Sequence, residues 1–126
     1  DMAFEGSKLT ITLPAASDLS AKQYRFVTVD GDGKLALSGD DGNAIGVLQN
    51  KPEADEAGVV AITGITKLYI GTTGSLDYGS IVSSQANGEG KIQDSGAYRL
   101  GIALEDSTAN GDIISILFTG ANGSTV

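Results

Sequence analysis

The side chains of this sequence that could do chemistry are mainly carboxylates in glycine-rich segments. Asp30-Gly31-Asp32-Gly33 resembles a fragment of a calcium loop, in which alternate carboxylates converge on a hard cation. With Asp32 and Gly33 at the fifth and sixth loop positions, however, Gly39 stands at the twelfth, where a bidentate glutamate is required. A hairpin turn explains the segment better, because glycine and aspartate favour the backbone angles of tight turns.

A second acidic cluster, Gly39-Asp40-Asp41-Gly42-Asn43, could bind a cation weakly if its carboxylates faced those of the preceding turn. A solvated turn is again the favoured interpretation. Gly33-Lys34 and Gly90-Lys91 resemble the end of a phosphate-binding loop, but no glycine lies five positions upstream and an aliphatic residue replaces the magnesium-binding hydroxyl. We therefore predict no metal, nucleotide or other cofactor site.

Catalysis would have to use carboxylate pairs or a serine–lysine dyad, because the sequence contains neither His nor Cys. The adjacent acids Glu105-Asp106 and Glu53, Asp55 and Glu56 lie in turn-like segments, where charged side chains are usually solvated. The four tyrosines are expected to be half-buried strand residues and not a sugar-binding platform. We expect no enzymatic activity.

The net charge of −8 opposes binding to nucleic acid and to anionic membranes by Coulomb repulsion. The longest apolar run is far shorter than the ~20 residues that cross a bilayer. Met2-Ala3-Phe4-Glu5 resembles a natural start, and no charged-then-apolar leader opens the chain. Nucleic acid and membranes are therefore not expected partners.

The positions that carry these groups lie between short runs of β-branched and aliphatic residues, separated by Gly, Asp and Asn. Leu9, Ile11 and Leu13 alternate with threonines, which predicts one buried and one exposed strand face. Pro52 to Ala57 is the best helical candidate, for at most a turn or two. The predicted strands are Lys8–Leu13, Tyr24–Val29, Lys34–Ser38, Ala44–Leu48, Val59–Ile65, Thr66–Ile70, Ser80–Ser84, Tyr98–Leu104 and Asp112–Phe118.

The sequence also repeats internally with a period of about 55 residues. Val27–Leu35 resembles Val82–Ile92 once two residues are inserted, and both indicate a strand, a Gly-acid-Gly-Lys hairpin and a second strand. Ile45–Ile62 similarly resembles Leu100–Ile116. This pattern predicts an all-β fold, a small β-barrel or sandwich of two pseudo-duplicated halves that share one core.

The expected organisation is an extended N-terminal arm, one β domain and a flexible tail. The predicted limits are 2–8 for the arm, 9–120 for the domain with halves at about 19–70 and 76–118, and 121–126 for the tail.

The order of these motifs resembles the capsid cement (decoration) proteins of tailed phages, a family long catalogued as a domain of unknown function. One departure is Lys51-Pro52-Glu53, where family members often have alanine-rich turns. The motifs that carry the resemblance are Leu9-Thr10-Ile11-Thr12-Leu13-Pro14-Ala15-Ala16, Phe26-Val27-Thr28-Val29, Ile45-Gly46-Val47-Leu48, Ala57-Gly58-Val59-Val60-Ala61-Ile62-Thr63-Gly64-Ile65, Leu100-Gly101-Ile102-Ala103-Leu104-Glu105-Asp106 and Gly111-Asp112-Ile113-Ile114-Ser115-Ile116-Leu117.

The resemblance implies a homotrimer, made in the host cytoplasm, that binds the outer surface of the mature phage head at three-fold or quasi-three-fold positions. There it would bind the major capsid protein and hold neighbouring subunits together against the pressure of packaged DNA. Many identical weak sites with several contacts per oligomer would give avidity.

Phe4, Leu9 and Ile11 are the expected capsid-binding residues. The arm before the first strand can become ordered on a partner by strand addition. Alternatively, Leu9 and Ile11 fill the core and the arm stays disordered. Two rival functions remain at this point, a tail or fibre accessory protein and a calcium-dependent surface-binding module.

Overall fold

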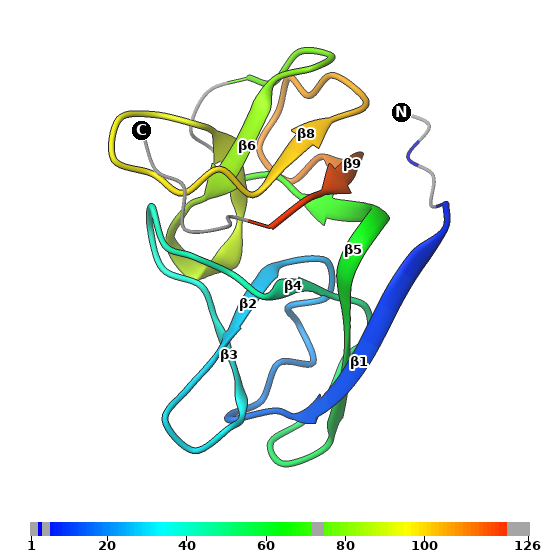
Figure 1. Ribbon diagram of the computed structural model, residues 1–126, viewed down its shortest axis with the longest axis vertical. Helices are drawn as coiled ribbons and strands as arrows, with labels where there is room; N and C mark the ends of the chain where they lie inside the picture. The colour runs from blue at the N-terminus through cyan, green and yellow to red at the C-terminus, as the bar shows by residue number, and fades with distance from the viewer. Residues whose placement is uncertain (1–2, 4–5, 72–74, 121–126) are drawn as a thin grey trace.

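The computed structural model describes residues 3, 6–71 and 75–120, and these form one nine-stranded antiparallel sheet with a single short 3-10 turn and no α-helix (Figure 1). The all-β prediction is confirmed. No helix in the described ranges is long and apolar enough to cross a membrane. The elements are β1 (Lys8–Pro14), β2 (Phe26–Val29), β3 (Leu35–Leu37), β4 (Gly46–Leu48), β5 (Ala57–Tyr69), β6 (Ile81–Ser84), η1 (Ala86–Gly88), β7 (Gly90–Ile92), β8 (Gly101–Ala103) and β9 (Ile113–Phe118).

The same arrangement of strands occurs twice in the sheet. The strand order is β3-β2-β4-β5-β9-β8-β6-β7, and β1 pairs with β5 beside this path. Each half has an outer hairpin, a middle strand and a central strand. Counterparts lie 55 residues apart: β2 begins at Phe26 and β6 at Ile81, and β4 begins at Gly46 and β8 at Gly101. The predicted duplication is therefore confirmed.

The repeat includes β1, whose counterpart is the second part of β5. Ala15 after β1 forms a parallel bridge to Leu35, and Ile70 after β5 forms the same bridge to Gly90. These bridges curl each half toward closure, so that each half resembles a half-barrel. We call the strands of residues 8–62 the first half and those of 63–118 the second half, and we propose these limits in place of 19–70 and 76–118. Figure 1 shows the first half below and the second above, with β5 running between them.

The hairpin turns show that the two residues inserted in the sequence alignment are unnecessary. Gly33 and Gly88 are counterparts and both have left-handed backbone angles, with φ of 77° and 71°. The Asp30 N–H donates to the Lys34 carbonyl at 2.8 Å, and the Gln85 N–H donates to the Glu89 carbonyl at 2.6 Å. The predicted match of Lys34 with Lys91 is therefore wrong by two positions, because the hairpins align on backbone geometry.

One strand, β5, replaces the two predicted strands Val59–Ile65 and Thr66–Ile70. Its first part pairs with β1 and β4, and its second part pairs with β9. The strand continues through Gly64, at a φ of 106°, because partners on both sides hold its backbone. The predicted helical turn at Pro52 to Ala57 is wrong. The segment is a β-turn, closed by a 3.0 Å hydrogen bond from the Glu56 N–H to the Glu53 carbonyl, and Asp55 inside it has a left-handed φ of 66°. Ala57 is already the first residue of β5.

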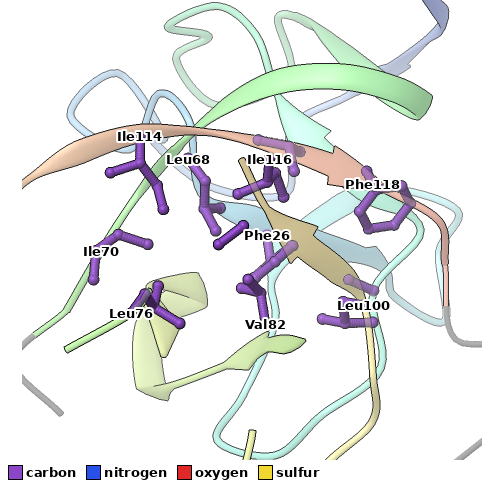
Figure 2. Packing of buried hydrophobic residues seen from close by; sticks show 12 residues of the cluster. Phe26, Leu68, Ile70, Leu76, Val82, Leu100, Ile114, Ile116 and Phe118 are labelled. Atoms are coloured by element: carbon purple, nitrogen blue, oxygen red, sulfur yellow. The ribbon is translucent and has the colours of Figure 1, made fainter. Parts of the chain in front are cut away.

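The core consists of two buried clusters and not the single shared core that was predicted. The first lies inside the first half and contains Ala15, Leu19, Val27, Leu35, Leu48 and Val60. The second lies inside the second half but also contains three residues of the first half, Phe26, Ala44 and Val47 (Figure 2). Side chains alternate across a strand, so Val27 faces the first cluster while Phe26 faces the second. The two halves are thus packed together through β2 and β4.

Candidate functional site

The strand β1 is the most exposed strand of the sheet. It pairs only with β5, so its other edge has no strand partner in the part of the chain that the structure describes. Four successive residues, from Leu9 to Thr12, are exposed, so both faces of β1 meet solvent. An edge strand with free backbone groups is a template for an added strand. Figure 1 shows β1 along one side of the molecule.

Leu9 and Ile11 form an apolar patch on one face of this strand. Leu9 is 58% exposed and Ile11 is 38% exposed, whereas Leu13 on the same face packs against the first buried cluster. Of the three residues predicted to be buried on this face, only Leu13 packs against the core. The prediction is wrong for Leu9 and Ile11, which are exposed and do not fill the core. Their exposure is what a binding role requires.

The predicted arm is only partly described. Phe4 lies outside the described residues, as does the predicted tail 121–126. Just before β1 the chain already pairs with β5, because the Ile65 N–H donates to the Ser7 carbonyl at 3.0 Å. An arm that is free up to residue 8 is therefore not confirmed.

The second acidic cluster faces a lysine and not the preceding turn. The side chain of Lys91 is almost fully buried, and its Nζ lies 3.0 Å from an oxygen of Asp40, 2.5 Å from one of Asp41 and 3.2 Å from one of Asp94. Burial alone would lower the pKa of Lys91, but the three carboxylates outweigh it and hold the pKa above its ordinary value. The ammonium links the loop after β3 to the hairpin β6–β7. Sequence reasoning missed this role because Lys91 resembled a hairpin residue.

The first acidic segment is a turn, as predicted. Oδ1 of Asp30 accepts hydrogen bonds from the N–H groups of Lys34, at 3.0 Å, and Asp32, at 2.9 Å. These two bonds, that from Lys34 first, lower the pKa of Asp30. Within the described ranges, no group of three or more acids could hold a metal ion.

A second cation also connects the two halves. Arg25 precedes β2, and its guanidinium lies 3.0 Å from a carboxylate oxygen of Glu89 and 4.4 Å from the ring centroid of Tyr69. The Arg25 and Glu89 side chains are both largely buried. Together with the contacts of Lys91, this pair joins the two halves.

Comparison with known families decides what kind of protein carries this surface. The family model for phage cement proteins matches residues 4–118, which include every strand of the sheet. The chain belongs to the phage cement protein family. The predicted resemblance is confirmed, and the cement protein is a structural component of the phage head that associates with the capsid.

Among solved structures, the cement protein is similar to the head fibre gp8.5 N base of bacteriophage phi29. The TM-score is 0.71 at 14% sequence identity, and the match covers 95% of this chain and 98% of that chain. At this identity the likeness shows the fold alone. Comparison with curated proteins gives no match.

Proposed function

We propose that this cement protein binds the outer surface of the mature phage head and stabilises contacts between neighbouring major capsid proteins. It has no enzymatic role, and it is made in the host cytoplasm before it joins the virion. Membership of the cement family supports the association with the head. The exposure of Leu9 on β1, a strand that pairs with β5 along one edge only among the described residues, is the single observation that supports the mode of attachment.

The attachment site consists of Phe4, Leu9 and Ile11. Leu9 and Ile11 present apolar surface beside an open strand edge, so a capsid segment can add backbone hydrogen bonds and at the same time cover both side chains. Burial of a leucine or isoleucine side chain contributes about 1.5–3 kcal/mol. One such site is weak, and several in one oligomer would bind firmly.

The functional oligomer is a homotrimer. Three copies at a three-fold position would each contact a different neighbouring capsid subunit, which is how a small protein can hold a lattice together. The net charge of −8 keeps the decorated particle dispersed.

A head location is favoured over the tail alternative by one specific likeness. The similar solved structure is the base of a head fibre, and the present chain covers 98% of it. A fold that serves there as a base supports an attachment role on the head for this chain.

The test is cosedimentation with undecorated heads of the source phage. The wild-type protein should pellet with heads to a fixed number of copies, and Leu9→Asp should stay in the supernatant because a carboxylate replaces the apolar contact. Val29→Asp is the matched control, since Val29 is also exposed but lies on β2. Removal of residues 2–5 tests Phe4 and leaves the Ser7–Ile65 hydrogen bond in place. Equal binding by Leu9→Asp and wild type would remove β1 from the capsid contact.

A further inference from the structure

The packing of the two halves against each other shows how this fold recognises its own repeat. Phe26 of β2, Val47 of β4 and Ala44, which lies two residues before β4, are buried in the core of the second half. The Phe26 ring lies 6.1 Å from that of Phe118, between ring centroids. We call Phe26, Ala44 and Val47 the docking face of the first half. The surface of the second half that they cover is the receiving surface.

The first half carries an uncovered copy of that receiving surface. Leu68, Leu100 and Phe118 of the second half are fully buried. Their counterparts are Leu13, Ile45 and Ile62, which pack against the first cluster but are only partly buried. Ile62 is the counterpart of Phe118 because Ala61 pairs with Val47 as Leu117 pairs with Ile102, so this part of the repeat is one residue off the 55-residue spacing. The difference in burial arises because the docking face covers the first set and no element among the described residues covers the second.

The second half likewise carries an unused copy of the docking face. The counterparts of Phe26 and Val47 are Ile81 and Ile102, at the same positions of β6 and β8. Phe26 and Val47 have no exposed surface, whereas Ile81 and Ile102 are half-buried. Arg99 replaces Ala44 and is exposed, as suits an arginine at the rim of an interface.

A matched pair of substitutions strengthens the correspondence. Inside the chain, Nε2 of Gln49 donates a 2.8 Å hydrogen bond to Oγ1 of Thr66, and this bond joins the halves. The counterpart of Gln49 is Leu104, and the counterpart of Thr66 is Ile11, both apolar. Both positions are apolar where their counterparts are polar, so the pair stays complementary if the two residues face each other across two molecules.

We propose that a second copy of this chain docks head to tail, with the outer face of β6 and β8 of one copy on the Leu13, Ile45 and Ile62 surface of the next. Leu104 of the first copy then contacts Ile11 of the second. Such a contact uses two different surfaces, so it can close into a ring. This inference rests on the proposed function in one respect, because the ring would be the homotrimer proposed above.

The docked copy leaves room for the proposed capsid contact. The counterpart of Leu9 is Gly64, which is not part of the second buried cluster and is partly exposed. Ile11 therefore lies where the neighbouring copy and the capsid meet, and Leu9 stays uncovered.

The first test is the molar mass of the purified full chain by light scattering over a range of concentrations, without capsids. The wild type should associate, and Ile102→Asp should raise the dissociation constant by at least about a hundredfold, because a carboxylate would enter an apolar contact. Ile92→Asp makes the same change at an exposed residue of β7 outside both surfaces and should leave association unchanged. A monomeric wild type, or equal association by Ile102→Asp and Ile92→Asp, would overturn the proposal. Neither result involves heads, so it is distinguishable from a failure to bind the capsid.

The second test uses the matched pair. Leu104→Gln and Ile11→Thr should each weaken association by about tenfold or more, since each leaves one polar group without a partner. The double variant carries both changes in every copy and reproduces the internal Gln49–Thr66 pair, so it should restore association. Additive losses in the double variant would show that the two positions do not meet. The melting temperature of each variant in its monomeric range shows whether the fold is intact.

Discussion

The rings of Phe26 and Phe118 lie with their centroids 6.1 Å apart and at 45° to each other, and this contact joins the two halves of the sheet. Phe26 comes from β2 and Phe118 from β9, and both are buried. Tilted aromatic pairs contribute beyond the area that they bury. Because the core of the second half includes Phe26, the halves should unfold as one cooperative unit.

Replacement of Phe26 by alanine should lower the free energy of unfolding by about 3–5 kcal/mol, since it leaves a cavity between the halves. Urea denaturation followed by circular dichroism and by tyrosine fluorescence measures this loss. Val29→Ala, on the exposed end of the same strand, should change stability by less than about 1 kcal/mol. Two separate transitions in the wild type would contradict the cooperative unit.

Lys91→Met should lower the free energy of unfolding by roughly 1–3 kcal/mol. The change keeps the length of the side chain but leaves Asp40, Asp41 and Asp94 close together without their cation. The loss is smaller than for a fully buried pair because the aspartates are partly solvated. Lys34→Met removes an exposed pair with Asp55 and should have little effect. An equal effect of both variants would argue against the buried link.

The difference in stability between wild type and Lys91→Met should depend on pH. The folded protein holds the pKa of Lys91 above its ordinary value of 10.5. The contribution of the ammonium is therefore complete below that pH and is lost as pH rises through the higher folded value. Urea denaturation from about pH 9 to about pH 12 should show the gap closing at the alkaline end. A gap that stays constant or widens would exclude a charge-based link.

Gly46→Ala and Gly101→Ala should both prevent folding or greatly destabilise the protein. A Cβ on Gly46 would collide with the Ala61 carbonyl, and a Cβ on Gly101 would lie 2.5 Å from the Leu117 carbonyl oxygen. The two glycines are counterparts in β4 and β8, so similar losses are expected. Gly31→Ala is the control, because its Cβ would meet no atom within 4 Å. If thermal melts show Gly46→Ala to be as stable as Gly31→Ala, the pairing register of β4 with β5 would be contradicted.

Millimolar calcium should leave the melting temperature unchanged. Asp30 accepts two backbone hydrogen bonds through one oxygen, and Asp40 and Asp41 face Lys91, so these carboxylates are already engaged. A ligand that binds only the folded state raises the melting temperature, and the rise grows with the logarithm of the ligand concentration relative to its Kd. A calcium-dependent rise, absent with magnesium, would revive the calcium-dependent binding module.

The strands and their duplication could be predicted from the sequence because both depend on local patterns. Alternating aliphatic residues and glycine-rich turns mark most strands, and the repeated Ile-Gly-Val and Leu-Gly-Ile motifs mark β4 and β8. The break predicted inside β5 did not occur, because partner strands and not the sequence around Gly64 determine where that strand ends.

The burial of individual strand faces could not be predicted from the sequence, because it depends on how the two halves pack against each other. Ile11 and Thr66 occupy equivalent strand positions, yet the isoleucine is 38% exposed and the threonine is fully buried. The alternation of apolar and polar residues along β1 assigns Ile11 to the core, because this pattern contains no information on how the neighbouring half packs. The role of Lys91 was missed for the same reason, since its three carboxylates come from residues 3 to 51 positions away.

The most direct test of the cementing role is the heat stability of phage heads with and without this protein. Undecorated heads of the source phage would be saturated with wild-type protein, and DNA release on heating would be followed with a fluorescent dye. Decorated heads should release their DNA at a higher temperature than undecorated heads, and heads mixed with Leu9→Asp should show no such gain. An unchanged release temperature for heads that have bound the wild-type protein would contradict a role in stabilising capsid contacts.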